Sequence, residues 1–196
     1  MRPLVITGSS RSGTHWISEV FTAAGIPCAH EQVFGLKRPR PANTLVESAW
    51  LAVPWLRDGW AVGCQIRHPL KVVGSLLRTR SFSDLDVRYG RWITTLFPEI
   101  EADTEIERAA NFWYTMTTEA LRWADEWWRL EDPDTAAMTR LIYLSGRQVA
   151  PGRLEEAVRV TPASNLKPEL KPAPKVGWAQ VPSKIRVLAR EVGYES

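Results

Sequence analysis

The chain has few of the features that mark disulfide-rich, membrane-spanning or nucleic-acid-binding proteins. Its 196 residues include only two cysteines, Cys28 and Cys64, with no metal-ligand spacing around them, so neither a disulfide framework nor a bound metal is expected. No apolar run approaches the ~20 residues of a membrane-spanning helix, and no internal repeat is present. The net charge is only +3, without a run of lysine or arginine, which argues against nucleic acid as a partner.

What the chain does contain is typical of a folded globular protein. Hydrophobic residues make up 44% and charged residues 24%, and the length suits one domain over residues 1–196 with a full core. The first residues predict a strand and a loop rather than a targeting segment, so we expect a cytoplasmic protein with reduced thiols. Ten tryptophans are present, and we expect them in the core or on the walls of an apolar cleft.

The most informative stretch is LVITGSSRSGTHW at residues 4–16. It predicts a short buried strand, a turn of small residues and the start of a helix that stops at Gly25. Such a turn leaves several backbone N–H groups pointing the same way, and the positive end of the helix dipole adds to them. The stretch therefore predicts a site for a phosphate or sulfate group.

The same stretch differs from an ATP-binding loop in one respect. Gly8 and Gly13 have the spacing of the Walker A glycines, but Thr14 and His15 follow where Lys-Ser/Thr is expected. The turn therefore suits a phosphate-like group without being built for ATP and magnesium. The alternative is a tight turn that binds nothing.

The rest of the chain alternates strands with helices. Strands or extended segments are expected at residues 26–34, 59–66 and 127–131, the last as a buried strand. Helices are expected at residues 44–55, 70–78, 104–125, 134–144, 151–158 and 182–192, with a loosely placed helix within 81–98 and loops at 37–43 and 161–176. Asp103 and Asp134 are expected N-caps, and Pro69 is expected at the first position of its helix. The alternation predicts an α/β fold with a central, mainly parallel sheet flanked by helices.

A second motif follows the strand at residues 59–66. Arg67 stands at the carboxyl end of that strand, where ligands of open α/β sheets bind, and Ser75 follows eight residues later. A Walker B strand would place an aspartate near this position to help hold magnesium. A cation there indicates that protein groups meet the charge of the ligand directly. The alternative is an arginine at a strand end and a serine on a helix face.

Together these stretches resemble the sulfotransferase family that uses 3′-phosphoadenosine 5′-phosphosulfate (PAPS). Residues 11–16, RSGTHW, are similar to the family's 5′-phosphosulfate loop, [KR]-S-G-T-T-W, and Arg67 with Ser75 is similar to its 3′-phosphate motif. Residues 127–133, 175–178 and 192–195 carry weaker likenesses to bacterial members. His15 departs from the pattern by replacing the second threonine, His68 stands where many members have aspartate, and the chain is short for the family. The resemblance implies a three-layer fold like that of P-loop NTPases.

The resemblance also implies which residues bind the donor. Those at the 5′-phosphosulfate are Ser10, Arg11, Ser12, Gly13, Thr14, His15 and Trp16. Arg67 would pair with the 3′-phosphate and Ser75 would add a neutral donor. In the family a late loop folds over the nucleotide, which points here to Lys171 and Lys175, with Lys167 beside them; the alternative is solvated loop lysines. For Trp16 the alternative is a place in the core.

The implied reaction is in-line transfer of the sulfuryl group to a hydroxyl or amine of a small-molecule, carbohydrate or lipid acceptor, leaving 3′,5′-ADP (PAP), with no metal required. Glu31 is the expected general base and His30 is the second choice. Arg11 is expected to stabilise the transferring group. Two other readings stay open: a P-loop small-molecule kinase, and a member that binds nucleotide without turnover. The acceptor and a homodimer are left open by the sequence.

Overall fold

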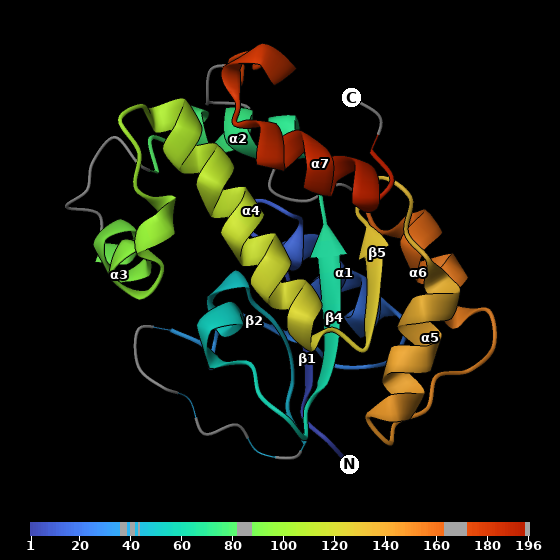
Figure 1. The fold of residues 1–196 in the computed structure, drawn as a ribbon. Coiled ribbons are helices and arrows are strands. Elements are labelled where there is room, and N and C mark those ends of the chain that lie inside the picture. Colours follow the sequence, from blue (N-terminus) through green and yellow to red (C-terminus); the bar gives the residue numbers. More distant parts are fainter. Residues whose placement is uncertain (36–38, 40–41, 43, 82–87, 163–171, 195–196) are drawn as a thin grey trace. The chain divides into compact units, whose positions relative to one another are not determined.

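The computed structural model describes residues 1–35, 39, 42, 44–81, 88–162 and 172–194 (Figure 1). The chain divides into two compact units. The first consists of Met1–Ile66 and Glu119–Leu166, and the second of Arg67–Thr118 and Lys167–Ser196. Within the described ranges, no helix has both the length and the apolar character needed to cross a membrane.

The first unit contains a five-stranded sheet in which every pairing is parallel. Its strands are β1 (Leu4–Thr7), β2 (Ala29–His30), β3 (Val46–Ser48), β4 (Ala61–Ile66) and β5 (Glu126–Arg129), in the order β2-β3-β1-β4-β5. Every residue of the central strand β1 is buried, which agrees with its run of apolar and β-branched side chains. The predicted α/β class with a parallel sheet flanked by helices is confirmed.

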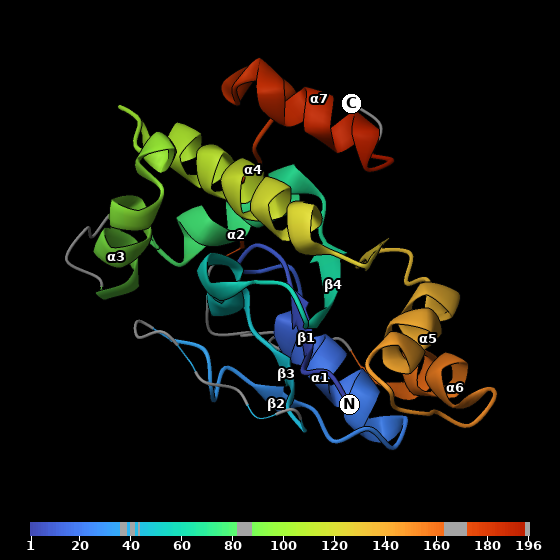
Figure 2. The ribbon, with the colours of Figure 1, turned by 60° about the horizontal axis from the view of Figure 1, so that its bottom comes forward.

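The helices of the first unit are α1 (Thr14–Ala23), α5 (Thr135–Leu144) and α6 (Arg153–Val160). α5 and α6 lie side by side in both ribbon views (Figure 1, Figure 2). Apolar side chains from these helices and from β1 form one buried cluster that includes Ile6, Phe21 and Leu141. α1 ends as predicted, because Gly25 adopts a left-handed conformation, φ 91°, that stops the helix. Asp134 caps α5 as expected, since its carboxylate accepts from the Ala137 N–H at 2.9 Å.

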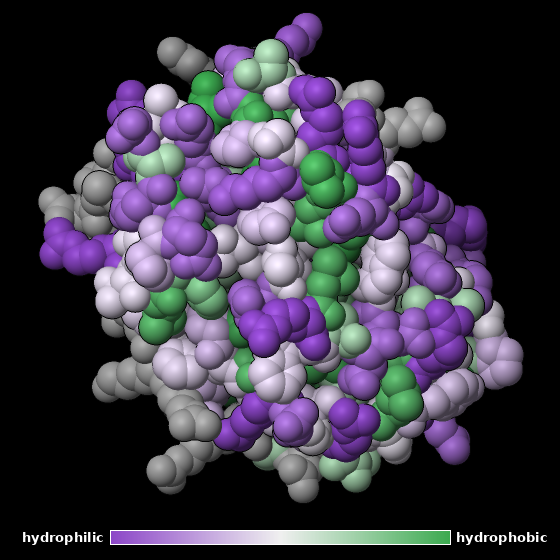
Figure 3. All heavy atoms as spheres, in the orientation of Figure 1, coloured by the Kyte–Doolittle hydropathy of each residue, from purple (hydrophilic) through white to green (hydrophobic). Residues whose placement is uncertain are grey.

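The second unit is helical. It contains α2 (Pro69–Arg78), α3 (Arg88–Leu96), α7 (Ser183–Glu191) and α4 (Glu105–Trp123), whose last residues belong to the first unit. Pro69 occupies the first helical position, as predicted. Figure 3, which draws residues of both units, shows mostly hydrophilic side chains on this face, with apolar side chains between them in narrow strips. Helices that present a polar face to solvent and an apolar face inward give this pattern.

Three predictions about local structure were wrong. Residues 44–55 do not form an α-helix: they form β3 and a 3₁₀ helix, Trp50–Trp55, because Val46–Ser48 pairs with strands on both sides and Pro54 lacks an N–H for regular helix bonds. The strand predicted as buried at 127–131 is β5, an edge strand in which Trp127 is 43% exposed. Thr104 rather than Asp103 caps α4, since the Glu107 N–H donates to its hydroxyl at 3.2 Å.

Candidate functional site

Three segments meet at the carboxyl edge of the sheet in the first unit. Ser48 at the end of β3 pairs with Ile6 of β1 and with His30 of β2. The residues that follow these three strands therefore lie at the same edge of the sheet. The turn of residues 8–13 follows β1, and Glu31 follows β2. The N–H of Glu31 donates to the Ser48 carbonyl at 3.2 Å. The edge at which the sequence predicts a ligand therefore carries both the turn predicted to bind an anion and the predicted base.

The turn of residues 8–13, called the anion loop below, needs its two Walker-like glycines. Gly8 has φ 153° and Gly13 has φ 87°. A Cβ at position 8 would lie 2.2 Å from the backbone oxygen of Gln65, and one at position 13 would lie 2.8 Å from Cδ1 of Leu130. Position 8 therefore excludes a side chain by space, because its neighbour is backbone, whereas at position 13 the Leu130 side chain would have to move; backbone conformation disfavours a side chain at both. Arg11 also adopts a left-handed conformation, φ 70°, which a non-glycine residue rarely does.

A buried side chain from β4 holds the anion loop in place. Gln65 is fully buried, and its amide Nε2 donates to the carbonyl of Ser12 at 2.7 Å. Its Oε1 accepts from Nε1 of Trp128 on β5 at 2.9 Å. Both ends of the amide are thus bonded, so its orientation is fixed. The anion loop is preformed by contacts with the sheet.

Several hydrogen-bond donors of the anion loop have no partner in the part of the chain that the structure describes. Among the residues that the structure describes, no side chain caps the N-terminus of α1, and the first N–H groups of a helix have no partner within it. The hydroxyls of Ser9 and Ser12 are buried and find no hydrogen-bond partner within the described ranges. The hydroxyl of Ser12 lies over Gly8, 2.9 Å from where a Cβ would be. An unbonded buried hydroxyl costs about 1–3 kcal/mol, so an anion that accepts from both would recover this cost.

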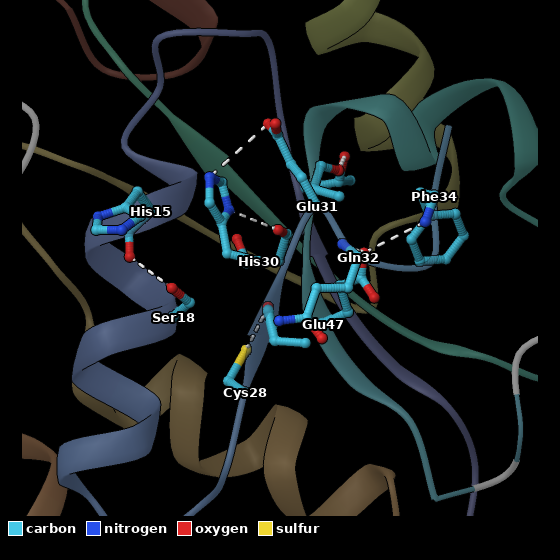
Figure 4. Close-up of polar contacts among 12 residues, drawn as sticks. His15, Ser18, Cys28, His30, Glu31, Gln32, Phe34 and Glu47 are labelled. Carbon is cyan, nitrogen blue, oxygen red and sulfur yellow. Dashed lines mark hydrogen bonds and ion pairs between the residues drawn. The ribbon is translucent and has the colours of Figure 1, made fainter. Parts of the chain in front are cut away.

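His30 and Glu31 form a pair at the end of β2 (Figure 4). Nδ1 of His30 lies 2.9 Å from the Ser48 carbonyl oxygen. Since a carbonyl only accepts, Nδ1 carries the proton and donates it. Nε2 lies 3.9 Å from Oε1 of Glu31. In this tautomer the lone pair of the imidazole is at Nε2, which lies at ion-pair distance from the carboxylate, beyond a direct hydrogen bond.

His15 brings the start of α1 to this pair. Its ring stands edge-on to the ring of His30, with the centroids 5.1 Å apart, and Nδ1 lies 3.7 Å from Oε2 of Glu19. Burial is the main cause that raises the pKa of Glu31, and the charge of Glu47 raises it further, whereas His30, His15 and Arg11 lower it. No group of three or more metal-ligating side chains occurs in the described part of the chain.

The other predicted residues of the 5′-phosphosulfate site lie in or next to the anion loop. Ser10 is half-buried in the anion loop, and Thr14 is the buried first residue of α1. Trp16 packs against the core cluster, and its Nε1 donates to the Thr161 carbonyl at 3.3 Å. These contacts give Trp16 a structural role in the first unit, and its predicted contact with the nucleotide stays a prediction.

The residues predicted at the 3′-phosphate lie in the second unit. Arg67 is half-buried directly after β4, and its carbonyl accepts from Nε1 of Trp113 at 3.0 Å. Ser75 is buried on α2. The adjacent Gly74 lies against residue 174, because a Cβ there would be 2.8 Å from the Pro174 oxygen. Lys175 is exposed. Lys167 and Lys171 lie outside the described residues, and the convergence of these cations on one nucleotide stays a prediction.

Sequence reasoning missed four residues that shape this site. Ser9 supplies a buried hydroxyl, Gln65 and Trp128 hold the anion loop, and Glu47 is a fully buried carboxylate on β3. A polar residue inside an apolar strand was the signal that could have identified them. Such a residue is expected to be buried, and buried polar groups occur where they have hydrogen-bond partners. Gln65 showed that signal, whereas Glu47 was assigned to a helix.

A scan of the chain against protein-family models finds no match, and a search of curated proteins finds no match either. The likeness to PAPS-dependent sulfotransferases therefore rests on the motifs of the chain itself and stays a prediction.

Proposed function

We propose that this protein is a PAPS-dependent sulfotransferase with a P-loop-like donor site, which moves a sulfuryl group onto a hydroxyl or amine of a small acceptor. One observation carries the proposal: the preformed anion loop, with two buried serine hydroxyls that have no partner among the described residues, shares its sheet edge with a carboxylate–imidazole pair. The first feature suits a tetrahedral anion. The second suits the removal of a proton from an acceptor.

The anion loop is proposed to bind the 5′-phosphosulfate. Ser9, Ser12 and the first N–H groups of α1 donate to its oxygens. Arg11 supplies a positive charge to the loop. A Walker loop carries its lysine three residues later, at the position that Thr14 occupies here. In the second unit, Arg67 and Ser75 are proposed to take the 3′-phosphate, with Lys171 and Lys175 as further basic contacts.

The proposed reaction is an in-line displacement at sulfur. The acceptor oxygen or nitrogen forms a bond to sulfur while the bond between sulfur and the bridging oxygen of the 5′-phosphate breaks. The electron pair of that bond stays on the phosphate oxygen, so PAP leaves. The acceptor proton passes to the carboxylate of Glu31, or to Nε2 of His30 beside it. A burial-raised pKa makes Glu31 a stronger base than an ordinary carboxylate.

Ligand-dependent thermal unfolding tests the donor assignment. We expect PAP without magnesium to raise the melting temperature, and 5′-AMP, which lacks the 3′-phosphate, to raise it much less. ATP with magnesium serves as the comparison, because a kinase would respond to it. Protection by ATP with magnesium and none by PAP would contradict the proposal.

A second measurement separates an enzyme from a protein that only binds nucleotide. With radiolabelled PAPS and a mixture of hydroxyl and amine acceptors, a sulfotransferase forms PAP and a labelled acceptor. A protein without turnover retains intact PAPS with every acceptor.

A further inference from the structure

Glu47 is a charged side chain in the middle of the sheet. It is fully buried on β3, where it pairs with Val5 of β1 on one side and Ala29 of β2 on the other. A carboxylate at such a position is costly to bury unless donors surround it. Donors to the Glu47 carboxylate are therefore expected nearby.

Three consecutive backbone N–H groups converge on this carboxylate (Figure 4). Oε1 accepts from Gln32 at 2.9 Å, from Val33 at 2.9 Å and from Phe34 at 3.3 Å, and Oε2 accepts from Val33 at 3.0 Å. Gln32 and Val33 have exposed side chains, yet their backbone N–H groups are bonded to this carboxylate. The carboxylate thus fixes the chain directly after the predicted base.

Glu31 lies between two anchored points. Its own N–H donates to the Ser48 carbonyl, and the next three N–H groups donate to Glu47. Glu31 itself has φ 51°, a left-handed conformation that costs a non-glycine residue about 1–3 kcal/mol and persists only where the surroundings impose it. β3 supplies both acceptors that impose it.

We propose that Glu47 is a positioning residue for the base: by gathering the N–H groups of residues 32–34, it holds Glu31 in the left-handed conformation that places its carboxylate beside His30. This inference rests on the proposed function only for its effect on turnover. The geometric part concerns the chain alone.

The same arrangement affects the proton affinity of the base. The pKa of Glu31 is raised first by burial, and the charge of Glu47 adds to this effect, against the opposing charges of His30 on β2, His15 on α1 and Arg11 in the anion loop. Removing the charge of Glu47 while keeping its shape should therefore lower the pKa of Glu31. A side chain that only fills space would not change it.

The geometric part is tested first on the unmodified chain by amide hydrogen exchange. We expect the amides of residues 32–34 to exchange slowly although two of the three side chains are exposed. Exchange at the rate of an open loop would overturn the proposal. The same measurement on Glu47→Gln should show faster exchange at these three amides. Glu156→Gln, which removes an exposed carboxylate paired with Arg159 on α6, is the matched control and should leave them unchanged.

The second test is NMR titration of the Glu31 side-chain carboxyl. We expect a lower pKa in Glu47→Gln than in the unmodified chain, and no change in Glu156→Gln. An unchanged Glu31 pKa together with unchanged amide exchange would overturn the proposal. Neither readout needs a substrate, so a failure of the sulfotransferase assignment does not affect them.

Steady-state kinetics test the link to catalysis. If turnover with PAPS is found, Glu47→Gln should lower kcat roughly 10²-fold, the order of loss expected from misplacing a catalytic group by about 1 Å, while PAP affinity stays unchanged. A normal kcat in a variant whose Glu31 pKa has moved would overturn the positioning role in catalysis. If the unmodified chain has no turnover, the proposed function fails, and the two preceding tests still decide whether Glu47 positions Glu31.

Discussion

The side-chain amide of Gln65 donates to the carbonyl of Ser12 at 2.7 Å while it accepts from the indole of Trp128. This contact joins the anion loop after β1 to the neighbouring strands β4 and β5. The anion loop is therefore held by the sheet, and a ligand would meet a loop that is already ordered. Such preorganisation lowers the free energy that binding must spend on ordering the loop.

The variant Gln65→Leu tests this support. Leucine fills a similar space but leaves the Ser12 carbonyl and the Trp128 N–H without their partner, and we expect a loss of about 2–4 kcal/mol in the free energy of unfolding from two broken buried bonds. PAP affinity should fall as well, because the anion loop loses its anchor. Urea unfolding and calorimetric titration measure the two effects. Gln148→Leu, at an exposed position, is the control and should change neither.

Gly13→Ala and Gly152→Ala form a matched pair. Both glycines precede a helix with positive φ, 87° and 75°, so alanine should cost each about 1–2 kcal/mol of conformational strain. Among the residues that the structure describes, the new Cβ would meet other atoms at position 13, namely Leu130 and the Gln65 amide, and none within 4 Å at position 152. We expect Gly13→Ala to lose PAP binding and to lower the free energy of unfolding more than Gly152→Ala does. Gly152→Ala should bind PAP normally. Equal unfolding free energies and equal PAP affinities would contradict the steric argument.

Ser12→Ala should have effects of opposite sign on stability and on binding. The hydroxyl of Ser12 is buried and has no partner in the part of the chain that the structure describes. Its removal should therefore stabilise the unligated protein by up to about 1–3 kcal/mol. If the hydroxyl donates to the bound anion, the same change weakens PAP binding. Thermal unfolding without ligand and calorimetric titration with PAP test this. A variant that is destabilised without ligand and binds PAP normally would show that the hydroxyl has another role.

Much of the fold follows from local patterns in the sequence. β1 and the anion loop were predictable because a short apolar run, two glycines and small polar residues occur together, and α5 was predictable from Asp134 at its N-cap. Residues 44–55 were not, because their apolar spacing fits a helix, and only pairing with β1 and β2 makes Val46–Ser48 a strand. Strand pairing depends on residues distant in the sequence, so local propensity does not decide it.

The candidate site likewise has residues that local patterns predict and residues that they do not. The anion loop was predicted from its residue types, and the His30–Glu31 pair from the resemblance to a family, because both lie in short motifs. The supports were not found, since Gln65 and Glu47 act through contacts with Ser12 and with residues 32–34. A motif identifies groups that meet a ligand, whereas the residues that orient those groups are set by three-dimensional packing.

The pH dependence of turnover should report on Glu31. A general base must be deprotonated, and burial raises the pKa of this carboxyl, so activity should be lost on acidification at a higher pH than the ordinary glutamate value of about 4.3 would give. In Glu31→Gln, turnover should collapse while PAP affinity stays near normal, and the residual activity should lack this acidic limb. A limb that persists in Glu31→Gln would assign it to another group, with His30 the first candidate.

The same raised pKa has a consequence for stability. A carboxyl whose pKa is higher in the folded protein binds its proton more tightly there than in the unfolded chain. Its contribution to the free energy of unfolding is therefore greatest below the unfolded pKa and is lost as pH rises through the folded pKa. The stability of the unmodified protein relative to Glu31→Gln should therefore fall as pH rises from below the unfolded pKa of Glu31 to above its folded pKa. Urea titrations at several pH values measure it, and a difference independent of pH would show that the pKa of Glu31 is not raised.

Arg67→Ala tests the cationic end of the proposed nucleotide site. If the guanidinium pairs with the 3′-phosphate, its loss removes a charge-assisted contact and should weaken PAP binding by roughly 1.5–3 kcal/mol. Affinity for 5′-AMP, which has no 3′-phosphate, should hardly change, so the ratio of the two affinities isolates this contact. Arg159→Ala removes an exposed arginine of α6 and controls for the change in net charge. Equal losses for PAP and 5′-AMP in Arg67→Ala would indicate a general effect on the fold, and an unchanged PAP affinity would remove Arg67 from the site.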